Sequence, residues 1–167
     1  MQIIIGNIIM LVASVIMVAS GLFESKKRIL TAQTIQITIA AIGCCILGSY
    51  PGMTNNLLSG LRNILEYHKK LTKAVKLVII FFAILLTACF NDIGFVGWLP
   101  TLACALFTMF MSTEKVVALK ILIIGSNLLW TIHDFYIMAY TAMVFDILYI
   151  LANIISIIKI KKASTSK

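Results

Sequence analysis

Charged residues are scarce in this chain of 167 residues: they make up 12% of it, whereas 61% of the residues are hydrophobic. Soluble domains have about twice that share of charged residues, because polar side chains must cover their surface. The composition therefore excludes a soluble enzyme and a disordered tail. It predicts an integral membrane protein whose outer surface contacts the lipid bilayer.

Motifs for catalysis and for metal binding are also lacking. The sequence has no glycine-rich phosphate loop, no nucleophile elbow and no H-E-x-x-H motif. Its four cysteines lie in apolar stretches without metal-ligand spacing. We therefore expect no enzymatic activity, no cofactor and no metal site. The net charge of +8 comes from basic residues at the ends of apolar segments, where they orient a membrane chain, so no nucleic-acid partner is expected.

The apolar segments predict how often the chain crosses the membrane. Candidate spans are 1–23, 29–47, 53–67, 73–91, 93–113, a segment that begins near Lys115 and Lys120 and ends at His133, and 141–158. The third of these is short and polar. If it crosses, the basic clusters at 26–28, 69–73 and 159–162 share one side with Lys115, and the opposite loops have no Lys or Arg. Basic residues stay on the cytoplasmic side. We therefore expect seven spans, with the N-terminus outside and the C-terminus in the cytoplasm.

An internal repeat is suggested by an offset of 90 positions, which aligns Tyr50 with Tyr140 and Asn63 with Asn153. The same offset maps the first three spans onto the last three and leaves the fourth over. One linker helix between two three-helix units keeps the units parallel, as in several families of membrane transporters. The predicted fold is all-α in a 3+1+3 arrangement: a first repeat at 1–70, a linker helix at 71–91, a second repeat at 92–160 and a cytoplasmic tail at 161–167. Coincidence between Leu- and Ile-rich segments is the alternative.

Two polar runs carry a resemblance to a known family. The runs are GSYPGMTNNLLSGLRN at 48–63 and NLLWTIHDFY at 127–136, the latter followed by AYTA at 139–142. They resemble signatures of the YgjV-type bacterial inner-membrane proteins, a family without a settled activity that is similar to the SWEET, SemiSWEET and PnuC transporters. The resemblance implies the bacterial cytoplasmic (inner) membrane and a SWEET-like pair of triple-helix bundles around a central path. SWEET carriers have a proline in several gating helices, whereas Pro100 alone lies within a predicted span here, so their hinge mechanism does not carry over intact.

Polar residues within the predicted spans indicate a candidate site, because each costs free energy in lipid. The third and seventh spans carry polar stripes at helical spacing, made of Asn55, Ser59, Arg62 and Glu66 and of Asp146, Tyr149, Asn153 and Ser156. Arg62 and Glu66 are spaced to form an ion pair, and the equal alternative for Arg62 is to bind an anion. Hydrogen bonding between helices is the simplest role for hydroxyl groups in such positions, and we favour it for Ser59, Ser156, Thr31, Thr34 and Thr38.

The repeat-related pair Asn63 and Asn153 is interpreted differently. We predict that the two amides face each other across the interface of the repeats and bind a polar solute, since an amide offers both donors and acceptors. Paired asparagines contact substrate in the SWEET-like relatives, so the resemblance implies the same role. The full predicted substrate-binding set is Asn63, Asn153, Trp130, Asp146, Arg62, Asn56 and Ser126.

The sixth span leaves alternatives open. Trp130 suits either an aromatic belt at the membrane interface or a stacking surface in the path. His133 and Asp134 are candidates for a proton relay, but neighbouring residues point about 100° apart on a helix. We therefore favour a hydrated helix end for these two residues.

The functional prediction is a membrane transporter, either a facilitator or a proton-coupled carrier, for a small polar metabolite such as a sugar or a nucleoside-like compound. It would work by alternating access between the two repeats. The alternative is a non-transporting accessory, immunity or regulatory protein. The expected partners are the lipid bilayer and a small-molecule substrate, and the sequence leaves open whether the chain forms a homo-oligomer.

Overall fold

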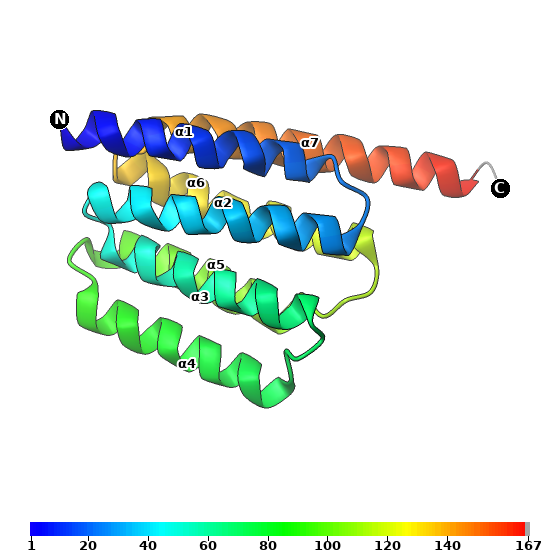
Figure 1. Ribbon diagram of the computed structural model, residues 1–167, viewed down its shortest axis with the longest axis horizontal. Helices are drawn as coiled ribbons and strands as arrows, with labels where there is room; N and C mark the ends of the chain where they lie inside the picture. Colours follow the sequence, from blue (N-terminus) through cyan, green and yellow to red (C-terminus); the bar gives the residue numbers. More distant parts are fainter. Residues whose placement is uncertain (166–167) are drawn as a thin grey trace.

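The computed structural model describes residues 1–165, which form an all-helical bundle with no strand among them (Figure 1). The helices are α1 (Gln2–Gly21), α2 (Lys26–Ile46), α3 (Tyr50–Tyr67), α4 (Lys73–Phe90), the 3-10 helix η1 (Gly94–Trp98), α5 (Leu99–Phe110), α6 (Val116–Tyr136) and α7 (Tyr140–Thr165). The all-α prediction is confirmed. Short turns connect the α-helices, so successive helices run in opposite directions along a common axis (Figure 1).

Within residues 1–165, five helices are long and apolar enough to cross a membrane: α1, α2, α4, α6 and α7 over Tyr140–Lys162. The apolar segment Gly94–Phe110, which contains α5, is shorter. The last helix is longer than predicted, because α7 continues through the basic residues after Ile158 to Thr165. Lysine is a good helix former in water, so a basic sequence does not end the helix. Within the predicted tail 161–167, residues 166 and 167 lie outside the described part of the chain.

Six α-helices surround a common centre. Neighbours pack in the order α1, α2, α3, α5, α6 and α7, and α7 closes the ring against α1. Helix α4 lies outside this ring against α3 and α5 (Figure 1). A hydrogen-bonded cluster of Asn55, Thr87 and Thr101 joins these three helices. The remaining surface of α4 exposes large apolar side chains such as Leu77 and Phe81, as expected for contact with lipid.

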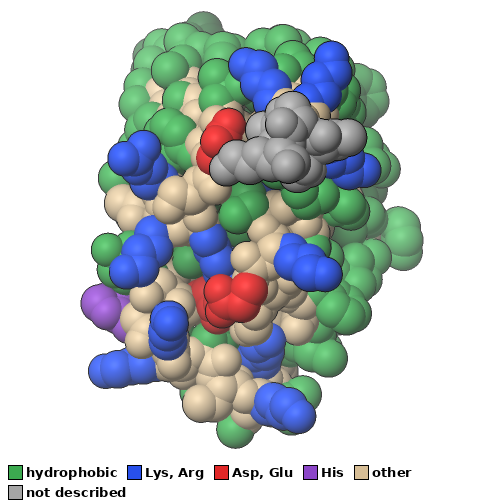
Figure 2. Space-filling model, turned by 90° about the vertical axis from the view of Figure 1, so that its right-hand side faces the viewer, with side chains coloured by type: hydrophobic (Ala, Val, Ile, Leu, Met, Phe, Trp, Pro, Cys, Tyr) green, Lys and Arg blue, Asp and Glu red, His purple; other side chains and the backbone are tan. Residues whose placement is uncertain are grey.

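Basic side chains gather at one end of the bundle (Figure 2). The α1–α2, α3–α4 and α5–α6 connections meet there with the end of α7, and they carry the clusters 26–28, 69–73 and 159–162. The connecting segments at the opposite end, 47–49, 91–93 and 137–139, contain no Lys or Arg. We call the two ends the basic end and the neutral end.

Candidate solute-binding site

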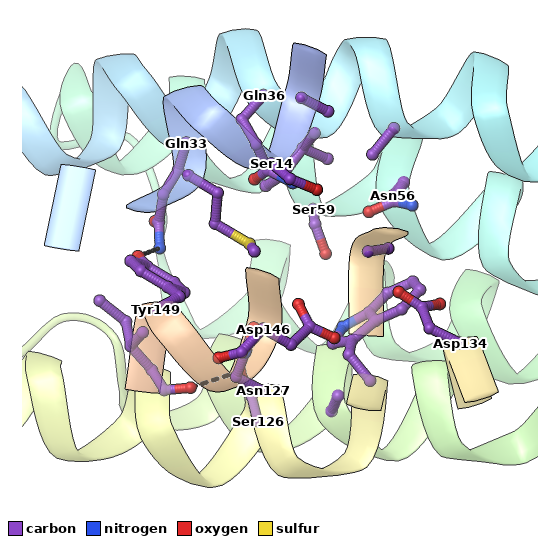
Figure 3. Close-up of a pocket in the computed structure, with 18 of the residues that line it drawn as sticks. Ser14, Gln33, Gln36, Asn56, Ser59, Ser126, Asn127, Asp134, Asp146 and Tyr149 are labelled. Atoms are coloured by element: carbon purple, nitrogen blue, oxygen red, sulfur yellow. Dashed lines mark hydrogen bonds between the residues drawn. The ribbon is translucent and has the colours of Figure 1, made fainter. Parts of the chain in front are cut away.

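A cavity with polar walls lies at the centre of the six-helix ring (Figure 3). It leaves about 90 Å³ of space that the centres of water molecules can occupy. A single water needs about 10–15 Å³ by this measure, so the cavity can hold several waters or a small polar solute. Its polar side chains are Ser14, Gln33, Gln36, Asn56, Ser59, Arg62, Ser126, Asn127, Asp134, Asp146 and Tyr149.

The structure brings five of the seven predicted residues together around this cavity: Asn56, Arg62, Ser126, Trp130 and Asp146. Sequence reasoning missed Gln33, Gln36 and Asn127, which also line it. These amides lie in predominantly apolar segments. The cost of burying an amide without a partner is the signal that would have identified them.

Asn63 and Asn153 are fully buried, but neither lines the cavity, and the expected meeting of the two amides in a common path is not observed. Each amide oxygen instead accepts from a buried cation. Asn63 Oδ1 accepts from Arg62 Nε at 3.2 Å and from Arg62 Nη2 at 2.9 Å, and Asn153 Oδ1 accepts from Lys120 Nζ at 3.5 Å. A buried cation without partners costs more than a buried neutral amide, so the cations determine how the amides are oriented.

Lys120 does not flank the start of a span as predicted, because α6 begins at Val116 and the lysine is fully buried within the bundle. Its Nζ donates to the backbone oxygen of Gly21 at 2.7 Å. Gly21 is the last residue of α1, where carbonyl groups have no partner within the helix and the helix dipole favours a cation.

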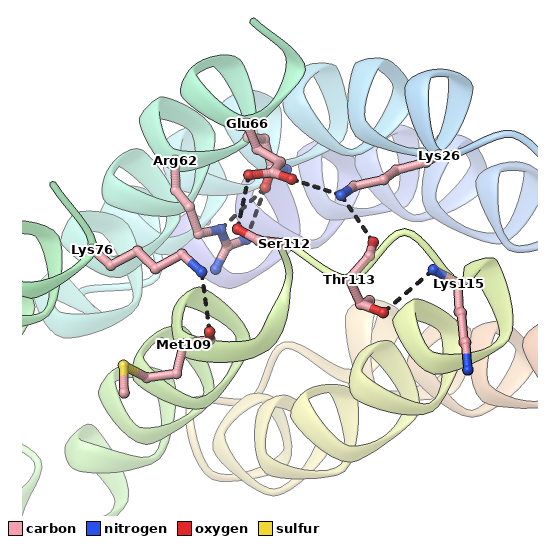
Figure 4. Close-up of polar contacts among 9 residues, drawn as sticks. Lys26, Arg62, Glu66, Lys76, Met109, Ser112, Thr113 and Lys115 are labelled. Carbon is pink, nitrogen blue, oxygen red and sulfur yellow. Dashed lines mark hydrogen bonds and ion pairs between the residues drawn. The ribbon is translucent and has the colours of Figure 1, made fainter. Parts of the chain in front are cut away.

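Arg62 does not pair with Glu66, contrary to the spacing argument. Its guanidinium lies over the ring of Phe107, 4.4 Å from the ring centre, and donates to Asn63 Oδ1. Glu66 pairs instead with Lys26 at 2.6 Å (Figure 4). The carboxylate thereby stays near the basic end, whereas the arginine points into the bundle.

The Lys26–Glu66 pair is part of a larger contact, which we call the basic-end latch. Lys26 Nζ also donates to the backbone oxygen of Thr113 at 3.0 Å, and Ser112 Oγ donates to Glu66 Oε2 at 3.2 Å (Figure 4). These bonds join the start of α2 and the end of α3 to the α5–α6 connection. The basic-end latch thus consists of polar contacts between the two halves of the chain.

A second set of contacts, the neutral-end latch, joins the α2–α3 turn to α6. His133 Nε2 lies 2.8 Å from Ser49 Oγ, and His133 Nδ1 lies 2.9 Å from Asp134 Oδ1. The prediction of a hydrated helix end is wrong, because His133 and Asp134 are both buried and bonded directly. Buried polar groups need partners. The two side chains therefore turn toward each other, although they leave the helix in directions about 100° apart.

Trp130 lies in the cavity lining, where its ring meets that of His133 edge to face with centres 5.4 Å apart. Of the two alternatives for this residue, the structure therefore places it inside the bundle.

The hydroxyl groups predicted to bond between helices differ in their partners. Ser59 Oγ of α3 donates to Cys104 Sγ of α5 at 3.5 Å, which joins two helices as predicted. The hydroxyls of Thr31, Thr34 and Thr38 instead donate to backbone oxygens of their own helix four residues earlier.

Two buried acceptor atoms of lining residues have no hydrogen-bond partner within the described residues: Asp146 Oδ2 and Gln33 Oε1. Asp146 is 3% exposed, and its backbone oxygen accepts from Asn127 Nδ2 at 3.0 Å. Gln33 is oriented by the bond from its Nε2 to the Tyr149 hydroxyl at 3.1 Å (Figure 3). Unpaired buried acceptors are uncommon, and here they mark a place for a donor.

Apolar helices of this length with lipid-exposed side chains around a polar centre define a multi-pass membrane protein. Residues 4–164 match the model of the family Imp-YgjV, described as bacterial inner membrane protein, and the chain belongs to this family. It is therefore a multi-pass protein of a bacterial inner membrane, and the predicted family is confirmed. Comparisons with curated proteins and with solved structures give no match.

Proposed function

We propose that the protein is a transporter that carries a small polar metabolite, such as a sugar or a nucleoside-like compound, across the inner membrane by alternating access. The observation that carries this proposal is the polar cavity, which lies at the centre of the ring, with one set of polar contacts between the two halves of the chain at each end of the bundle. Polar side chains within membrane helices commonly mark a solute path. Seven spans, with the basic end in the cytoplasm, follow from the positive-inside rule.

The helix boundaries support two parallel repeats joined by α4. At the offset of 90, α6 (116–136) corresponds to the whole of α2 (26–46), and α7 begins at the residue that corresponds to the start of α3. The turns correspond as well: Gly48 and Met138 both have positive φ, at 79° and 60°. The ring order α1, α2, α3, α5, α6, α7 is the order that an approximate two-fold axis along the bundle would produce.

The cavity lining supports the same axis. Ten pairs of lining residues stand 90 positions apart in the sequence, and they include Asn56 with Asp146 and Cys44 with Asp134. A cavity built from corresponding positions of two repeats lies at their interface. That is where transporters made of repeats bind their substrates.

The two latches supply the elements that would open in turn. At the basic end, Lys26 and Glu66 of the first half bind the segment 112–113 of the second half. At the neutral end, Ser49 contacts His133, and Asn7 bonds the backbone at 138 and 141. Each latch consists of a few polar contacts, so a rocking motion of one half against the other can open one end while the other stays closed.

Reconstitution into proteoliposomes tests this proposal. Uptake of labelled sugars, nucleosides and small amines would be compared between wild-type protein, the isosteric variant Asp146→Asn and empty vesicles. The exposed loop residue Asp92 supplies the matched control Asp92→Asn. We expect at least one solute to enter faster than in empty vesicles, with a loss of flux in Asp146→Asn alone. If folded protein moves none of them, and a partner protein co-purifies with it, the accessory role replaces the transport role.

A further inference from the structure

We propose that the solute bound in the cavity is a small organic cation whose protonated amine lies between Asp146 and Asp134, beside the ring of Trp130. This inference rests on the proposed transport function and narrows its substrate class. The charges and the unpaired acceptors of the lining support it.

Asp146 lacks a protein cation. The ion pairs within the described residues are Lys26–Glu66 and His133–Asp134, so no basic nitrogen lies within 4.0 Å of the Asp146 carboxyl. Its Oδ2 has no hydrogen-bond partner in that part of the chain, although the residue is 3% exposed. A buried carboxylate is costly unless a cation and hydrogen-bond donors satisfy it. A ligand amine in the cavity supplies both.

The second unpaired atom in the lining is also an acceptor. The bond from Gln33 Nε2 to Tyr149 leaves Gln33 Oε1 without a partner among the described residues. An ammonium group has three donors and no acceptor, which is the complement of such a surface. The remaining unpaired buried atoms, in Asn55, Asn63 and Ser156, belong to residues that do not line the cavity.

Arg62, the cationic side chain in the lining, already has partners within the protein. Arg62 bonds Asn63 and lies over Phe107, and no ion pair joins it to either acid. Along α3 it is six residues beyond Asn56, a rise of about 9 Å. The lining therefore has two carboxyl groups and one guanidinium, and Asp146 is the acid for which the protein supplies no counter-ion.

The acids that line the cavity both belong to the second half of the chain. Asp134 and Asp146 come from α6 and α7 (Figure 3), whereas Cys44 and Asn56 stand 90 positions earlier in α2 and α3. The amine would thus lie toward the second half, with the face of Trp130 available for a cation–π contact. The neutral amides of the first half remain for hydroxyl or amide groups. These features favour an amino alcohol or an amino sugar over a neutral sugar.

Three probes of one skeleton test the charge requirement directly: ethanolamine, ethylene glycol and glycolate are a cation, a neutral diol and an anion at pH 7. Binding to the full-length protein in detergent would be measured by thermal unfolding and calorimetry. We expect ethanolamine to raise Tm and the other two to leave it unchanged. Equal stabilisation by ethylene glycol or glycolate, or no effect of ethanolamine, would overturn the proposal.

Variants identify the binding group. Asp146→Asn should lower the affinity for ethanolamine by roughly 30-fold, because it removes one partner of a buried charge pair. Asp146→Glu should retain more of the affinity, and Asp134→Asn should lose less, since Asp134 is already bonded to His133. Asp92→Asn should bind as the wild type does. Unchanged affinity in Asp146→Asn would contradict the assignment, and if that variant does not fold, the three-probe comparison on wild-type protein decides.

Flux measurements separate this inference from the proposed function. Binding of ethanolamine that depends on Asp146, without uptake into proteoliposomes, would retain the amine site and refute transport. Uptake of a neutral sugar that ethanolamine does not inhibit would retain transport and refute the amine site.

Discussion

Asn63→Ala probes whether this asparagine stabilises a buried charge. The substitution removes the acceptor of two Arg62 donors at 3.2 and 2.9 Å and leaves the guanidinium, in a residue 4% exposed, with the Phe107 ring as its remaining contact. Hydrogen bonds to a charged group contribute about 1.5–3 kcal/mol. The loss is offset in part because Asn63 Nδ2 has no partner among the described residues, and removing a buried unpaired donor recovers about 1 kcal/mol. We therefore expect a net decrease of about 0.5–2 kcal/mol in the free energy of unfolding.

The repeat-related variant Asn153→Ala is the matched control. Its cation, Lys120, keeps the 2.7 Å bond to Gly21, and the bond that is lost is long at 3.5 Å, so the decrease should be smaller. Unfolding would be followed by circular dichroism during titration with sodium dodecyl sulfate in mixed micelles. Adding Arg62→Met to Asn63→Ala should cancel much of the loss, because no charge then remains unpaired. Additive effects of the two changes, or equal losses in the two alanine variants, would refute the reasoning.

Further predictions concern the latches and the topology. Gly52→Ala should lower stability by about 1–3 kcal/mol, because the new Cβ would lie 2.8 Å from an oxygen and 3.0 Å from a ring carbon of the neutral-end latch. Gly60→Ala is the control, since a Cβ there has nothing within 4 Å. Thermal unfolding compares the two variants, and equal losses of stability would contradict the packing. Glu66→Gln should weaken the basic-end latch and speed the reaction of the buried Cys104 with a maleimide added from that side, and an unchanged rate would show that the latch does not gate the cavity. A cysteine at position 70 should react with an impermeant reagent only from the cytoplasmic side; labelling from outside would reject the seven-span topology.

The helices were predictable because hydropathy and charge are local properties of the sequence. Long apolar runs define most of the spans, and the basic clusters lie at one end as expected. The polar stripes of α3 and α7 also predict cavity residues, since Ser59, Arg62 and Asp146 line the cavity. Periodicity shows which helix face is polar, and polar faces avoid lipid.

The choice of partners was not predictable in the same way. Arg62 and Glu66 have ideal spacing for an ion pair. Arg62 nevertheless bonds the neutral Asn63, and Glu66 pairs with Lys26 of another helix. His133 reaches Ser49 across 84 positions. Such contacts depend on the distances between helices and on the reach of long side chains, neither of which spacing within one helix describes. Lys120 was misplaced for the same reason, because its partners lie on α1 and α7.

The central claim is that the cavity opens alternately to the two sides of the membrane. The most direct measurement is the reactivity of a single cysteine at the lining position Ser126, in a chain whose native cysteines are replaced by alanine. Ser156→Cys, buried outside the lining, is the matched control. We predict that a small impermeant thiol reagent modifies Ser126→Cys from both faces of sealed, oriented vesicles and leaves Ser156→Cys unmodified. Modification of Ser126→Cys from one face only, or from neither, would contradict alternating access through this cavity.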